Sequence, residues 1–320
     1  MMYRSPLFTP EYSPQFSGHE TFPMRYGWLK KAYESVDKQN SINPDESFFN
    51  DDAAVATLGV GKNMVTSIRH WAIHCDVIKT KGKGKGEDPG EIGQKLFGSD
   101  GLDPYMESPN TLWLLHWQLA SKAKLTTWYW VFNHHPNNIF ERENILNSLK
   151  RISNENGWNR TSPATIKRDI ECFFRTYAAK PIDGKNTHED AVESPLTELG
   201  LIKATGKKDG FRMVKGEKNT LGIGVFTYAL LEFWDNYTSA NTLSFEAIAH
   251  HPGSPGRVFQ LSENDIIERL GNVSHISGGK VDWSETAGLK QMVRYEKIPL
   301  ENRLCLIDRD FQKTSKNEAA

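Results

Sequence analysis

The sequence has few cysteines, no long apolar run and almost no excess charge, and each of these features excludes a class of protein. Its 320 residues include only three cysteines, Cys75, Cys172 and Cys305, which lie far apart. We expect reduced thiols in the core, and neither a disulfide framework nor a cysteine-based zinc site. No stretch approaches the roughly 18 apolar residues that span a bilayer, and the first residues lack the apolar segment of a signal peptide. We therefore expect a globular cytoplasmic protein.

The net charge of the chain is −1, from 39 basic and 40 acidic residues. A nearly neutral protein does not coat nucleic acid with its whole surface, although a local basic patch can still neutralise phosphates. Apolar residues make up 38% of the sequence, which supports two or three cores at about 100 to 150 residues each. Any contact with DNA must therefore be local.

The first informative stretch is the segment 16–31, FSGHETFPMRYGWLKK, in which aromatic residues surround His19, Glu20 and Arg25. Cleavage of a phosphodiester needs an activated water, charge neutralisation at the phosphate and a proton for the leaving oxygen. His19 suits a base or metal ligand, Glu20 an orienting group or metal ligand, and Arg25 a phosphate clamp. His19 and Glu20 serve one site only if Gly18 makes a turn. The alternative is structural: the aromatics anchor the segment, and the three polar side chains satisfy one another or the backbone.

The segment 51–76 predicts a helix-turn-helix. Asp51 and Asp52 are placed to cap an apolar helix, and Gly59 and Gly61 allow the turn that follows. A second helix then begins at Lys62. Its spacing is that of a helix that enters a DNA groove.

The first residues of such a second helix face the bases. We therefore predict that Lys62, Asn63 and Arg69 contact DNA, Lys62 and Arg69 at phosphates or guanine edges and Asn63 at an adenine edge. On the same helix, His70 and His74 are four residues apart, which raises the question of zinc. Since the segment lacks the glutamate of the zinc-protease pattern, we favour a packing or groove-facing role for both.

A hairpin is predicted after this helix, with strands at 77–80 and 92–97 and a glycine-rich tip between them. The tip carries Lys81, Lys83 and Lys85. Lysines on such a tip can lie along a phosphate backbone as point charges. The alternative is a solvated loop without a partner.

A second acidic pair, Asp103 and Glu107, lies in the segment DPYMESPN just before an apolar helix. Together with Glu20, Asp103 and Glu107 have the carboxylates that Mg²⁺ or Mn²⁺ prefers alongside water and phosphate oxygens. The alternative is that Asp103 and Glu107 cap the loop and the N-terminus of the helix. The sequence contains no familiar nuclease motif, so a nuclease assignment rests on these residues alone.

The rest of the chain predicts further short helices and strands. Helices are expected at 162–177, 225–234, 244–249 and 262–270, and strands at 211–214 and 289–295. The fold class is therefore mainly α with small β wings, in tandem winged-helix or helix-turn-helix units, with domains at 1–120, 121–240 and 241–320. Arg257, in the turn SPGR, is a secondary phosphate-contact candidate, although the sequence favours a structural turn role for this segment.

The segments 16–31, 58–71, 103–116, 254–257 and 283–286 resemble the domain-of-unknown-function 4007 family. That family includes the SspB-type component of bacterial systems that place phosphorothioates in single DNA strands. The resemblance implies a DNA-binding protein that nicks one strand in anti-phage defence. It also implies a cysteine desulfurase and ATP-dependent sulfur-transfer proteins as partners. Two alternatives stay open: a non-catalytic DNA-recognition adaptor that recruits the modifying enzymes, and a winged-helix transcription regulator.

Overall fold

The chain folds mainly into helices, with three small antiparallel sheets, so the predicted fold class is confirmed at this level. The computed structural model describes residues 5–50, 52–82, 85–158, 161–179, 194–206, 209–286 and 288–311. The buried apolar side chains of these residues form one connected core. Within this described part, no helix has the length and apolar character that crossing a membrane requires.

The N-terminal part contains three helices followed by a two-stranded hairpin. In chain order these are α1 (Trp28–Ile42), α2 (Ala53–Leu58), α3 (Lys62–His74), β1 (Ile78–Thr80) and β2 (Glu87–Pro89). Gly59 ends α2 with a φ of 68°, a conformation that favours glycine, as the predicted turn requires. Asp52 precedes α2 but makes no capping hydrogen bond, and Asp51 lies outside the described residues.

The predicted second strand of the hairpin, 92–97, is wrong, because these residues form helix α4 (Glu91–Phe97). Ile92, Leu96 and Phe97 are buried together on one helical face, which is a spacing of four and five residues rather than two. The strand that pairs with β1 is the polar segment β2, in which Thr80 lies opposite Glu87. A short apolar run does not by itself distinguish strand from helix.

Three helices in the centre are buried on nearly all sides: α5 (Pro109–Ala120), α6 (Thr126–Asn133) and α10 (Ile223–Tyr237). Buried polar groups on such helices need hydrogen-bond partners. His116 of α5 has a partner at each ring nitrogen. Its Nδ1 accepts from the Tyr177 hydroxyl at 2.8 Å, and its Nε2 donates to the Val258 carbonyl at 2.8 Å. His116 therefore joins the central helix to two later elements.

One order of elements occurs twice. It is a helix, a strand, two or three helices, and two more strands. The first copy comprises α6, β3 (Ile139–Glu141), α7 (Arg142–Glu155), α8 (Pro163–Tyr177), β4 (Ile202–Ala204) and β5 (Gly210–Met213). The second comprises α10, β6 (Thr242–Ser244), α11 (Phe245–His250), α12 (Pro255–Val258), α13 (Glu263–Ser277), β7 (Val281–Thr286) and β8 (Leu289–Arg294). The strand orders, β3-β5-β4 and β6-β8-β7, are also the same.

The helix starts that the sequence predicts in these two copies are confirmed. The Ser162 hydroxyl accepts from the Thr165 amide at 3.1 Å at the start of α8. The Ser262 hydroxyl accepts from the Asp265 amide at 3.3 Å at the start of α13. The prediction of three core thiols is wrong for Cys305, which is exposed next to the short helix α14 (Leu300–Leu304).

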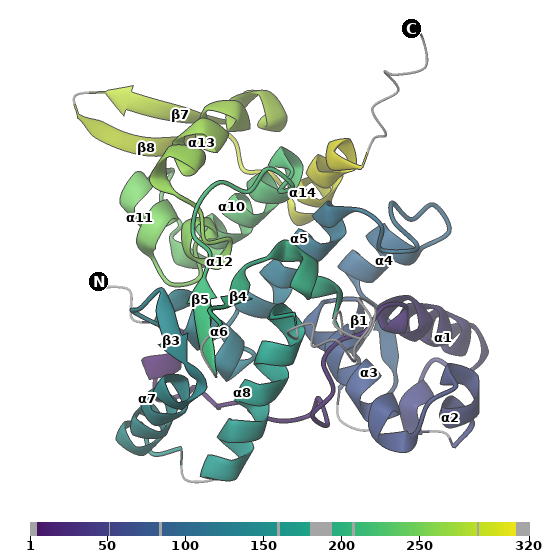
Figure 1. Cartoon of the computed structure of the whole chain (residues 1–320). Helices are drawn as coiled ribbons and strands as arrows, with labels where there is room; N and C mark the ends of the chain where they lie inside the picture. Colours follow the sequence, from purple (N-terminus) through teal and green to yellow (C-terminus); the bar gives the residue numbers. More distant parts are fainter. Residues whose placement is uncertain are drawn as a thin grey trace, which may run out of the picture.

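Figure 1 shows how these parts are arranged. Helices α1, α2 and α3 lie at one end of the molecule, and the β7–β8 hairpin projects at the opposite end. The central helices α5 and α6 lie between them, next to α12. The N-terminal segment 5–27 runs from the middle of the molecule to α1, so that its motif residues contact more than one unit.

Candidate nucleic-acid interface

The N-terminal motif forms a tight loop just before α1. Gly18 has a φ of 108°, and Glu20 and Thr21 have φ angles of 47° and 64°. Left-handed backbone at non-glycine residues costs about 1 to 3 kcal/mol each and persists only where neighbours hold it. Here the Phe22 amide donates to the His19 carbonyl at 2.8 Å, and Arg175 of α8 donates to the Thr21 carbonyl at 2.8 Å.

The loop separates two ionisable side chains that are neighbours in the sequence. His19 is 2% exposed, whereas Glu20 lies at the surface. Gly18 is needed for this course of the chain, because a side chain there would come within 2.6 Å of the His70 ring. The turn at Gly18 exists as anticipated, but it directs His19 inward and leaves Glu20 in solvent.

His19 is hydrogen-bonded through both of its ring nitrogens. The Thr21 amide donates to Nδ1 at 3.0 Å, so Nδ1 is an acceptor and the proton lies on Nε2. Nε2 then donates to Asp169 of α8 at 2.8 Å. Neither nitrogen can take up a proton or a metal ion without the loss of one of these bonds. The geometry therefore supports the structural alternative for His19, and its catalytic role stays a prediction.

Asp169 is the partner that sequence reasoning did not identify, since it lies 150 residues from His19. Its side chain is 1% exposed. Burial raises the pKa of Asp169, and the hydrogen bond from His19 offsets part of this rise. The contact joins the N-terminal loop to the middle of α8.

Two more histidines complete this buried polar cluster. The His70 and His74 rings of α3 lie 4.2 Å apart, and the His19 ring is 5.7 Å from that of His70. Burial lowers the pKa of both His70 and His74, and the pKa of His70 falls well below its usual 6.5. Both rings are therefore neutral near pH 7. They pack between units, which is the packing role expected for them.

Asp103 lies in the loop between α4 and α5 and is 6% exposed. One of its oxygens accepts from the Glu107 amide at 2.9 Å, and the other accepts from the Ser108 amide at 2.9 Å and from the Thr111 hydroxyl at 2.5 Å. These three bonds use most of the about four acceptor positions of a carboxylate. Asp103 thus stabilises the loop and the start of α5, which is the capping alternative that the sequence allowed. Its role as a metal ligand stays a prediction without support from this geometry.

The side chains of Glu20 and Glu107 are the exposed carboxylates of the two motifs. Arg25, between them in the sequence, is half-buried, with its guanidinium 5.6 Å from the centre of the Trp28 ring. In the described part of the chain, no three His, Cys, Asp or Glu side chains are grouped so that they could hold a metal ion. The residues present do not form a ready magnesium site.

The first turn of α3 is solvent-exposed, and Lys62 and Asn63 both lie there. Arg69, two turns on, is instead held by the hairpin: its Nε donates to Glu87 at 2.7 Å. The Glu87 carboxylate is 1% exposed and also accepts from the Ser47 hydroxyl. Lys62 and Asn63 are therefore available to a ligand, whereas Arg69 links α3 to β2.

The two described lysines of the hairpin, Lys81 and Lys85, have different settings. Lys81 donates to the Pro44 carbonyl at 2.6 Å and pairs with Asp88 at 3.0 Å, so it is anchored to its own unit. Lys85 is exposed, and Lys83 lies outside the described residues. Arg257, in α12 beside the central helices, is half-buried and donates to the His250 carbonyl at 3.1 Å. Among the described residues, Arg257 makes no contact with Lys81 or Lys85.

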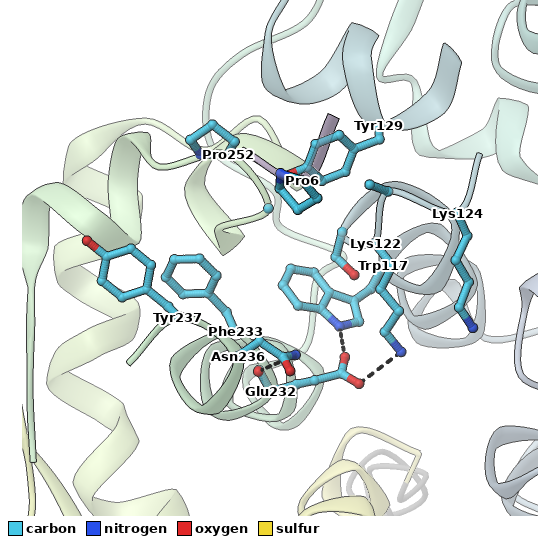
Figure 2. Close-up of a pocket in the computed structure, with 13 residues that line it drawn as sticks. Pro6, Trp117, Lys122, Lys124, Tyr129, Glu232, Phe233, Asn236, Tyr237 and Pro252 are labelled. Atoms are coloured by element: carbon cyan, nitrogen blue, oxygen red, sulfur yellow. Dashed lines mark hydrogen bonds and ion pairs between the residues drawn. The ribbon is translucent and has the colours of Figure 1, made fainter. Parts of the chain in front are cut away.

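A cavity of about 420 Å³ opens between α5, α10 and the loop 121–124. Figure 2 shows the aromatic rings of Phe233 and Tyr237 on one side, with Lys122 and Lys124 on the other. Lys122 pairs with Glu232 at 2.9 Å, so one of the two lysines in the lining is balanced by a carboxylate. Sequence reasoning missed the cavity, because its walls come from segments more than 100 residues apart.

The chain was compared with known families and structures. A family model described as "Protein of unknown function (DUF4007)" matches residues 16–310. A crystal structure of magnesium-ion-bound SspB is similar to the chain with a TM-score of 0.82 and 28% sequence identity, over 97% of this chain and 90% of that one. A second SspB crystal structure matches with a TM-score of 0.79 and 29% identity, over 94% and 88%. No curated protein matches the sequence.

Proposed function

This chain belongs to the DUF4007 family, and from that premise we propose that it is a DNA-binding component of an SspB-type phosphorothioation system that nicks one DNA strand. The observation that carries the proposal is the similarity to SspB over 97% of the chain at 28% identity. A match of this length includes every unit of the fold and is not a likeness of one small domain.

DNA binding is further supported by the order of elements. A helix, a strand, two or three helices and a two-stranded wing, with the first strand next to the last, resembles the order of a winged helix, and it occurs twice in the described part of the chain. We propose that these two copies and the N-terminal α1–α3 unit with its hairpin are three winged-helix units. In such units the last helix before the wing enters the groove. That helix is α3 in the first unit, where Lys62 and Asn63 are exposed.

For nicking, we propose Glu20 and Glu107 as the acidic groups to test, in place of the buried His19 and Asp103. Hydrolysis adds the oxygen of water to phosphorus, breaks one bond from phosphorus to a sugar oxygen, and transfers a proton to that leaving oxygen. An exposed carboxylate can orient the water or accept its proton, and an arginine such as Arg25 can neutralise the phosphate.

The test is conversion of supercoiled plasmid to the open-circular form by purified protein, with and without Mg²⁺ or Mn²⁺. We expect nicking by the wild type, loss of nicking with retained DNA binding in Glu20→Ala or Glu107→Ala, and loss of binding in Lys62→Ala with Asn63→Ala. Nicking that persists in both carboxylate variants would contradict the assignment of these residues.

The second candidate is a non-catalytic adaptor that recognises DNA and recruits the sulfur-modifying enzymes, for which we propose a cysteine desulfurase and ATP-dependent sulfur-transfer proteins. The observation that favours it is the engagement of His19 and Asp103 in structural hydrogen bonds, together with the lack of a grouped metal-ligand set in the described residues. DNA binding without nicking under any metal condition would select this function.

A further inference from the structure

Tyr105 is an exposed aromatic residue on the loop between α4 and α5. Its side chain is 73% exposed, the highest fraction among the large apolar and aromatic residues in the described part of the chain. Lys30 of α1 lies against it, with Nζ 4.2 Å from the centre of the ring. The two residues come from the two sequence motifs, 16–31 and 103–116. Single exposed aromatic side chains are common on protein surfaces. Tyr105 differs in that a cation lies against its ring and its loop is fixed by hydrogen bonds.

The loop that carries Tyr105 is held rigidly on both sides. Asp103 accepts the three hydrogen bonds described above, and its own amide donates to the Leu96 carbonyl at 3.2 Å. Met106 has a φ of 57° and a side chain that is only 5% exposed. Left-handed backbone at such a residue is maintained at a cost, which is typical of functional loops. The buried neighbours thus fix the backbone and direct the Tyr105 ring outward.

We propose that Tyr105 and Lys30 form a stacking platform for one unpaired base of a DNA strand. This proposal rests on the proposed DNA-binding function and adds the form of DNA that is recognised. The flat face of a base is accessible only when the base is unstacked, as in single-stranded or opened DNA, and aromatic side chains bind it by stacking. A platform that is already rigid loses little conformational entropy when the base binds.

The charge beside the ring fits the phosphate that accompanies such a base. The half-buried Lys30 pairs with the exposed Glu34 at 3.7 Å on α1. A long ion pair at the surface is weak, so Lys30 can turn to a phosphate. Glu107 lies two residues after Tyr105 on the same loop. A base on Tyr105 therefore brings its strand toward one of the carboxylates proposed for nicking.

The test measures binding of the full chain to three fluorescein-labelled DNAs by fluorescence anisotropy: a single strand, a duplex with a central unpaired bubble, and the fully paired duplex. We expect Tyr105→Ala to weaken binding of the first two by about tenfold, the effect of one lost base-stacking contact. Binding of the paired duplex should change less than twofold. Tyr105→Phe keeps the ring and should bind like the wild type.

Tyr295→Ala is the matched control, because Tyr295 is 70% exposed and follows β8 at the base of the β7–β8 hairpin, outside the two strands of the proposed wing. It should leave binding of the single strand unchanged. Since both tyrosines are exposed, thermal melting should show that each variant is folded.

The proposal is overturned if Tyr105→Ala binds the single strand as well as the wild type does, if it weakens the paired duplex equally, or if Tyr295→Ala causes the same loss. Unchanged DNA binding with loss of a protein partner would assign Tyr105 to a protein contact instead. If the wild type binds none of the three DNAs, the proposed function itself fails, which is a result distinct from failure of the platform alone.

Discussion

Replacement of His19 by alanine should destabilise the protein strongly, because it leaves the buried Asp169 without its hydrogen-bond donor. The two side chains are 3% and 1% exposed and lie 2.8 Å apart. Removal of one partner of a buried pair costs about 3 to 5 kcal/mol, since the remaining group is left buried and unpaired. We expect a loss of this size in the free energy of unfolding of His19→Ala.

Asp169→Asn is the matched variant. The side-chain oxygen of asparagine can still accept from His19 Nε2, so the hydrogen bond is kept while the charge is removed. We expect this change to cost no more than about 1 kcal/mol. In the Asp169→Asn background, His19→Ala should then cost only about 1 to 3 kcal/mol, because a neutral unpaired amide is less costly to bury than a carboxylate.

The measurement is urea unfolding of the wild type, the two single variants and the double variant, followed by circular dichroism. The expected non-additivity, about 2 kcal/mol, isolates the contact between His19 and Asp169. A cost below about 1 kcal/mol for His19→Ala, or an equal cost in both backgrounds, would refute this reasoning. If the chain nicks DNA as proposed, Asp169→Asn should nick like the wild type at temperatures where it is folded, because the exposed Glu20 and Glu107 are unchanged.

The same pair predicts a pH dependence. Burial raises the folded-state pKa of Asp169 above its usual value of 3.8. Folding therefore favours the protonated form, and the contribution of Asp169 to stability is complete below pH 3.8 and is lost as the pH rises through the folded-state pKa. Asp169→Asn lacks this loss. Its free energy of unfolding should consequently increase relative to that of the wild type as the pH is raised from about 4 to 7.

Three further predictions concern single sites. Asp103→Ala should lower the free energy of unfolding by about 2 to 4 kcal/mol, since three donors lose a charged acceptor. Magnesium should shift the melting temperature of this variant as little as it shifts that of the wild type. A magnesium shift seen only in the wild type would instead identify Asp103 as a ligand. Burial lowers the pKa of His116 to about 4. The contribution of the neutral His116 to the free energy of unfolding is therefore complete above pH 6.5 and should fall by up to about 3 kcal/mol as the pH decreases from 6.5 to 4. His116→Leu should remove this pH dependence, as measured by urea unfolding. Lys62→Ala should reduce the slope of the logarithm of the DNA-binding constant against the logarithm of the salt concentration by about 1. Lys81→Ala loses the contacts with Pro44 and Asp88. It should therefore lower the melting temperature and leave that slope unchanged.

Several elements follow from the sequence because their causes are local. Ser162 and Ser262 each cap a helix through an amide three residues on, and Gly59 supplies the left-handed turn between α2 and α3. Asp103 is a similar case, since all of its partners lie within eight residues. Its capping role was one of the two alternatives that the sequence offered.

Other features were decided only when distant segments came together. The run 92–97 is helical because one face of it packs against Val77 and Tyr33, where the backbone at Gly93 fits tightly. The polar segment Glu87–Pro89 is a strand because its backbone pairs with β1, and Arg69 of α3 pairs with its buried Glu87. Neither condition is visible in the spacing of apolar residues.

The sequence by itself determined that this protein is mainly helical, which segments cap and turn, and which two motifs carry the candidate functional side chains. Tertiary structure alone decided which of those side chains are buried and which reach solvent. His19 and Glu20 are neighbours in the chain, yet Asp169, 150 residues away, holds the first inside while the second stays exposed. The physical reason is that capping and turn formation depend on atoms within a few residues. Burial depends on packing between distant segments, and the local pattern of residues does not show which segments will meet.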